Sequence, residues 1–157
     1  MPESTRSYHR ATVSALLSIL ERVATGGEQL SHAENVLFAA CEIWAAAGTG
    51  TLADVLGPES TDGLRTAAMV FVTVGALQTA AMLRGAADAT AVASGARERL
   101  KSLEALGARL RGSTEPVDRL IARYAASVVS TPVGRDGAGH AIAGPPAPSN
   151  APGLVLH

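Results

Sequence analysis

Apolar residues recur every three or four positions through most of the first 131 residues, and this spacing is the strongest constraint on the fold. Residues three and four apart lie on one face of a helix, so the pattern predicts amphipathic helices. Alanine and leucine supply most of these positions, with 31 Ala and 17 Leu against two Phe, two Tyr and one Trp. Such a composition favours helices and disfavours a β-sandwich or barrel. The predicted fold class is therefore all-α.

Glycines and helix-capping residues mark the first two helices. The first is expected from about Ser4 to Ala24, because the glycine pair at 26–27 follows it. The second begins at Ser31, which is followed three residues later by Glu34 in the pattern of a capping box. The short connection between the two helices predicts that they pack as an antiparallel hairpin.

The rest of the chain up to residue 131 is predicted to add two or three long helices. Their expected spans are a long apolar helix from about 61 to 87, a fourth over 88–111 and a fifth from Thr114, with a short helical piece at 52–56 before them. Residues 1–131 are thus predicted to form a single bundle of four to five helices. Residues 132–157 hold five of the eight prolines, which predicts a flexible, disordered tail.

One uncharged stretch raises the question of a membrane. Residues 66–83 carry no charge and lie between Arg65 and Arg84, which reaches the lower length limit for crossing a bilayer. Three threonines, a glutamine and five alanines make the stretch only moderately hydrophobic, and no Trp or Tyr flanks it. A helix buried in the middle of a bundle is also apolar on every side. A core helix is therefore favoured, and membrane association through 66–83 is the alternative.

The overall charge argues against a general nucleic-acid binder. Thirteen basic residues face fourteen acidic ones, for a net charge of −1, whereas phosphate binding usually requires a basic excess. Residues 51–68 loosely resemble a helix-turn-helix, but Pro58 lies in the turn, and Glu59 and Asp62 would face phosphate. The N-terminus is polar and charged where a signal peptide is apolar, which predicts a cytoplasmic protein.

The charges are unevenly distributed along the chain. Residues 1–88 carry five Arg and nine acidic residues, whereas residues 89–157 carry eight basic and five acidic ones. We expect some of these to pair within a helix, as Lys101 with Glu104 and Glu115 with Arg119. The alternative is an interaction face that binds the acidic half of another copy or an acidic protein. Its candidate residues are Arg97, Lys101, Arg109, Arg119 and Arg123.

The residues that usually carry chemistry are sparse. Cys41 is the single cysteine, which excludes a disulfide within the chain and a multi-cysteine zinc site. It shares an apolar helix face with Leu37 and Trp44, and His32 falls on nearly the opposite face, so Cys41 is predicted to be a small buried side chain. His9 is the histidine that the predicted hairpin could bring near it. No di-iron Glu-x-x-His pair, phosphate loop or catalytic triad is present, and no metal or cofactor is predicted.

These observations favour a non-enzymatic helical interaction or assembly module of the adaptor or chaperone kind. It is expected to form a homo-oligomer or to bind a protein partner, because alanine-rich helix faces suit close helix–helix contact. The alternative function is a small-molecule-binding or enzymatic bundle. Its predicted pocket is lined by Phe38, Cys41, Trp44 and Phe71.

Overall fold

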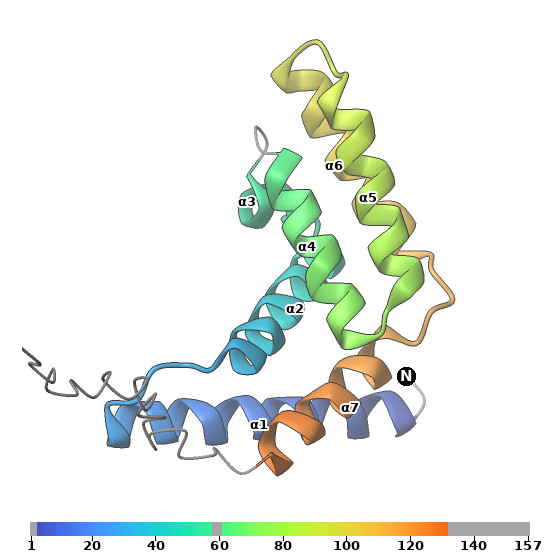
Figure 1. Cartoon of the computed structure of the whole chain (residues 1–157). Coiled ribbons are helices and arrows are strands. Elements are labelled where there is room, and N and C mark those ends of the chain that lie inside the picture. The colour runs from blue at the N-terminus through green and yellow to red at the C-terminus, as the bar shows by residue number, and fades with distance from the viewer. Residues whose placement is uncertain (1–2, 58–60, 132–157) are drawn as a thin grey trace, which may run out of the picture.

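The computed structural model describes residues 3–57 and 61–131, and the secondary structure of this part of the chain consists of helices, without strands (Figure 1). The prediction of an all-α fold is confirmed. The predicted tail, 132–157, lies outside the described residues. The helices are α1 (Glu3–Gly26), α2 (His32–Thr49), α3 (Leu52–Leu56), α4 (Thr61–Val74), α5 (Leu77–Ala91), α6 (Ala96–Arg111) and α7 (Val117–Ser130).

The helices form a base and an upright part (Figure 1). Helices α1 and α7 pack against each other at the base, and α2 rises from the end of α1 to contact α4. Helix α5 packs along α4, and α6 covers α5. The core follows these contacts, and its largest fully buried side chains include Phe71, Leu37, Leu64, Leu83 and Leu106.

The start of α2 is formed by the capping box that the sequence predicts. The Glu34 amide donates to the Ser31 Oγ at 3.2 Å, and the Ser31 amide donates to Glu34 Oε2 at 2.8 Å. These two bonds satisfy amides that have no partner inside the helix. At the other end, Gly50 adopts a left-handed φ of 81°, which closes the helix.

The prediction of one continuous apolar helix over 61–87 is wrong, because the chain reverses direction in the middle of this range. Gly75 has a φ of +90°, a conformation that other L residues rarely adopt, and α4 ends just before it. Helix α5 then runs back along α4, so that the uncharged stretch 66–83 forms two packed helices. Small residues on both helices permit this approach. In the described ranges, no helix is both long and apolar enough to span a membrane.

The predicted fourth helix, 88–111, also divides into two. Helix α5 continues to Ala91, and α6 begins at Ala96 after a short turn. The turn is stabilised by the Ser94 amide, which donates to the Glu98 carboxylate at 2.9 Å. The break at Gly75 adds one helix, whereas the turn after Ala91 only displaces the boundary predicted at 87–88. With the short α3, the described residues form seven helices where four to five were predicted.

The predicted hairpin of the first two helices does not form, since α1 packs mainly against α7. The apolar face of α2 is occupied by α3, α4, α6 and α7. Near the end of α1, Arg22 forms ion pairs with Glu28 in the connection and with Glu34 in the first turn of α2. Burial opposes ionisation of Glu34, but the Ser31 amide and Arg22 outweigh it and lower the pKa of Glu34.

The alanine-rich helix faces are buried inside the molecule, where the helices pack against one another. Because alanine has a small side chain, helices that meet at alanines approach closely and leave little room for a second chain. The buried alanines are Ala40, Ala46, Ala47, Ala67, Ala68, Ala76, Ala80, Ala86, Ala87, Ala122 and Ala125. The faces that the sequence offered for contact with a partner therefore stabilise the fold itself.

Candidate functional site

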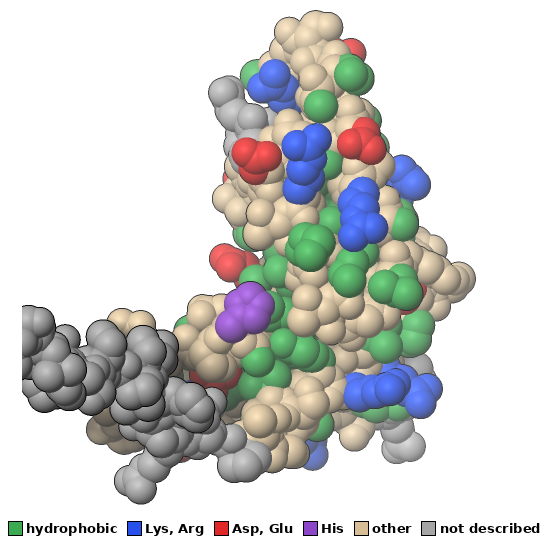
Figure 2. Space-filling model, viewed as in Figure 1, with side chains coloured by type: hydrophobic (Ala, Val, Ile, Leu, Met, Phe, Trp, Pro, Cys, Tyr) green, Lys and Arg blue, Asp and Glu red, His purple; other side chains and the backbone are tan. Residues whose placement is uncertain are grey.

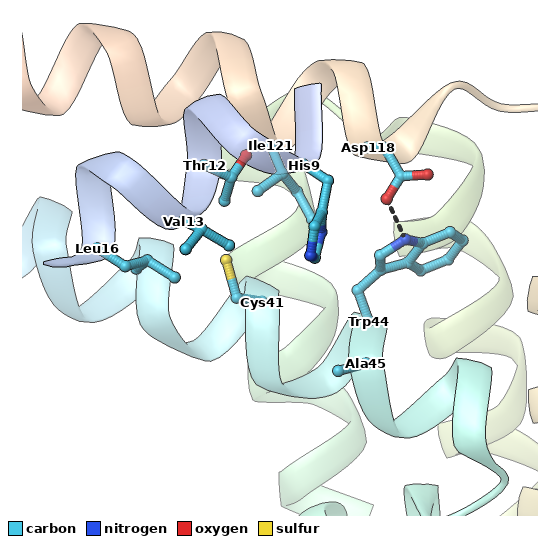
Figure 3. A pocket seen from close by; sticks show the side chains of 9 residues that line it. All are labelled: His9, Thr12, Val13, Leu16, Cys41, Trp44, Ala45, Asp118 and Ile121. Carbon is cyan, nitrogen blue, oxygen red and sulfur yellow. Dashed lines mark hydrogen bonds between the residues drawn. The ribbon is translucent and has the colours of Figure 1, made fainter. Parts of the chain in front are cut away.

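A cavity of about 380 Å³ lies where α1, α2 and α7 meet (Figure 3). This volume is within the range of small-molecule sites. Helix α1 supplies one wall, α2 the opposite wall, and the first turns of α7 close one side. The lining residues are His9, Thr12, Val13, Leu16, Cys41, Trp44, Ala45, Asp118 and Ile121.

The polar side chains at one end of the cavity, Trp44 and Asp118, are joined by a hydrogen bond. The Trp44 Nε1–H donates to Asp118 Oδ1 at 2.9 Å, which joins α2 to the first turn of α7 (Figure 3). An acidic side chain in the first turn of a helix is also favoured by the helix dipole. A second bond between the same helices runs from the Tyr124 hydroxyl to the Ala33 carbonyl at 3.3 Å. These contacts fix the indole and the carboxylate relative to each other.

His9 and Cys41 both line the cavity, and the His9 ring points into the space between Cys41 and Trp44 (Figure 3). The thiol is half-buried, and burial raises the pKa of Cys41 to about 11. A thiol is a poor nucleophile in its protonated form, which is the form that this pKa maintains at neutral pH. The cavity therefore holds Cys41 as an apolar wall residue and not as an activated thiolate.

This assignment predicts slow alkylation of Cys41. At pH 8 the raised pKa lowers the thiolate fraction about 100-fold relative to an unperturbed thiol, and the greater nucleophilicity of a more basic thiolate offsets part of this. Iodoacetamide should therefore react at least about tenfold more slowly with the folded protein than with the urea-unfolded chain. The rates are measured by mass spectrometry of samples quenched over time. The unfolded chain is the control for intrinsic reactivity. Equal rates in the two states would show that Cys41 is activated or exposed.

The structure brings together only half of the predicted pocket. Cys41 and Trp44 line the cavity, but Phe38 is half-buried against the core and Phe71 is fully buried within it, so neither lines the cavity. Sequence reasoning missed Asp118 and Ile121, because their contribution depends on α7 packing against α1 and α2. The i, i+3 and i+4 pattern of α7 predicts that Ile121 is buried, but not what it contacts.

The predicted basic interaction residues are all exposed, on two helices. Arg97, Lys101 and Arg109 belong to α6, and Arg119 and Arg123 to α7. On the face shown in Figure 2, basic side chains lie scattered among acidic and apolar ones and form no continuous patch.

The predicted pairs of Lys101 with Glu104 and of Glu115 with Arg119 are not formed. Within residues 3–57 and 61–131, the ion pairs are those of Arg22 and Arg65. Glu115 instead forms a carboxylate clasp at the start of α5. It accepts from the Gln78 amide at 2.9 Å and from both the amide and the hydroxyl of Thr79 at 2.7 Å. These are the amides that a helix N-terminus leaves without partners.

Helix α1 carries an exposed apolar stripe formed by Val13, Leu17 and Leu20. These residues are 38%, 61% and 47% exposed. The spacing of four and three residues puts them on one side of the helix. The side of α1 that packs inward instead buries Thr12 and Ile19.

The described residues provide no evident metal centre. No group of three or more His, Cys, Asp or Glu side chains lies close enough together in this part of the chain to hold a metal ion. Comparisons with protein-family models, with curated proteins and with solved structures found no match. The fold and the site thus define an all-α protein with an apolar cavity and an exposed apolar helix stripe.

Proposed function

We propose that this protein is a non-enzymatic helical interaction module that self-associates, with two copies meeting along α1. The observation that carries the proposal is the α1 stripe of Val13, Leu17 and Leu20. Three large apolar side chains on one open helix face are stabilised when a second helix removes them from water. The remaining exposed large hydrophobic residues of the described chain are Met69, Leu77, Val92, Leu100 and Val129, and none of them belongs to α1.

The charges beside the stripe favour an antiparallel pair of α1 helices. Arg10 and Glu21 flank the stripe on the same side, one near each end, and neither has an ion-pair partner among the described residues. In a two-fold antiparallel pair, equivalent flanks of the two helices face each other, and each end of one helix meets the opposite end of the other. Arg10 of each copy would then lie beside Glu21 of the other. A parallel pair would lack this complementarity.

The residue numbers of the apolar positions agree with an antiparallel pair. In an antiparallel pair the numbers of facing residues add to a nearly constant value. With Leu17 on the two-fold axis, Leu17 faces Leu17 of the other copy, and Val13 faces Leu20. Apolar residues then fill the centre of the interface, and Arg10 and Glu21 lie about one turn from perfect opposition at its edges.

A Leu17→Glu variant tests the interface. Two glutamates would face each other at the axis of the dimer, whereas in the monomer Leu17 is already exposed, so the variant should fold normally and run as a monomer. Light scattering on a size-exclusion column at micromolar concentration measures the mass. Met69→Glu is the matched control, because Met69 is 59% exposed on α4, and this variant should remain dimeric.

A charge exchange tests the orientation. Arg10→Glu and Glu21→Arg should each weaken the dimer, and the double variant should restore it. A monomeric wild-type protein, or a Leu17→Glu variant that remains dimeric, would refute the proposed interface. A double variant weaker than both single ones would refute the antiparallel arrangement.

A further inference from the structure

The cavity between α1, α2 and α7 has apolar walls and one polar end. Val13, Leu16, Ala45 and Ile121 supply apolar contacts, and the paired Trp44 and Asp118 lie at one end (Figure 3). Apolar walls with a few fixed polar groups are the usual construction of a small-molecule site. The cavity borders the proposed interface and shares Val13 with it, whereas Leu17 and Leu20 do not line the cavity.

One carboxylate oxygen of Asp118 is available to accept a hydrogen bond from a ligand. Trp44 donates to its Oδ1, and no described residue donates to its Oδ2. A carboxylate only accepts hydrogen bonds, and its strongest partners are cationic N–H groups. Asp118 is half-buried beside apolar side chains, where an ion pair is screened less than on an open surface.

The other residues that line the cavity favour a positively charged ligand over a negatively charged one. The indole of Trp44 is the aromatic ring that best attracts a cation over its face. No Lys or Arg lines the cavity, so an anionic ligand would meet the Asp118 charge without compensation. His9 also lines it and supplies a further polar side chain.

We infer that the cavity binds a small primary amine with an apolar body. The ammonium group donates to Asp118 and lies near the Trp44 ring, and the apolar body fills the space between Val13, Leu16 and Ile121. This site goes beyond the self-association proposed above and does not depend on it.

Three probes of nearly equal size and different charge test the inference. They are cyclohexylmethylamine, cyclohexylmethanol and cyclohexanecarboxylate, and the fluorescence of Trp44, the single tryptophan, reports their binding to the full chain. The amine should bind at least tenfold more tightly than either other probe at neutral pH. Leu17→Glu should bind the amine as the wild type does, which separates this site from the interface.

Two variants locate the site. Asp118→Asn retains an oxygen for the Trp44 bond but removes the charge, so it should lose the preference for amine over alcohol. Glu104→Gln, which changes an exposed carboxylate on α6, should retain it. Ala45→Leu should obstruct the cavity and weaken all binding, without altering the Trp44–Asp118 pair.

The inference fails if the three probes bind equally, if none binds, or if Asp118→Asn keeps the wild-type preference. It fails equally if Ala45→Leu binds the amine as tightly as the wild type does. Circular dichroism of each variant confirms folding. If Asp118→Asn does not fold, the probe series on the wild type and Ala45→Leu decide the question.

Discussion

Replacing Phe71 with alanine is expected to lower the free energy of unfolding by about 3–5 kcal/mol. Phe71 is 0% exposed, in α4 at the centre of the core. Its removal would leave a cavity lined by side chains of helices that cannot close the gap without moving, and both the lost apolar burial and the cavity destabilise the fold. Urea denaturation followed by circular dichroism measures the effect.

The control lies two residues away. Met69→Ala changes an exposed residue of the same helix, and its expected effect is within about 0.5 kcal/mol. Phe71→Leu, which retains most of the apolar volume, should cost about 1–1.5 kcal/mol and stays measurable if Phe71→Ala does not fold. Similar losses for Phe71→Ala and Met69→Ala would contradict the packing of α4 against α2 and α5.

The helices that the sequence predicts best are those whose signals are local. The capping box of Ser31 and Glu34 and the last helix, α7, are formed as expected, because each depends on residues within one or two turns. The reversal at Gly75 was missed for a different reason. A glycine within an apolar stretch is compatible with a continuous helix or with a turn, and the packing of α4 on α5 decides between them.

Contacts between distant segments account for the remaining differences. Nothing near α1 in the sequence indicates that it packs on α7, more than 90 residues later, and not on α2. Because α1 packs on α7 and not on α2, Leu17 is exposed and Asp118 lies at the cavity. Trp44 was included in the predicted pocket from its position on an apolar helix face, but its partner Asp118 depends on the tertiary fold.

Replacing Glu115 with alanine is expected to lower the free energy of unfolding by about 2–3 kcal/mol. The carboxylate accepts three hydrogen bonds from Gln78 and Thr79, and the Thr79 side chain is fully buried, so water cannot easily replace the lost acceptor. The charge also stabilises the N-terminus of α5 through the helix dipole. Glu104→Ala is the control, since Glu104 is exposed on α6.

Glu115→Gln separates charge from hydrogen bonding. The amide retains one acceptor oxygen, so we expect about half of the alanine effect, together with faster hydrogen exchange at the Gln78 and Thr79 amides in both variants. Asp118 lies three residues after Glu115 at the start of α7. The clasp therefore also positions the carboxylate that binds Trp44, and Glu115→Ala should shift the Trp44 fluorescence even in conditions where the protein remains folded. An unchanged spectrum and a stability equal to that of Glu104→Ala would show that the start of α7 is fixed without Glu115.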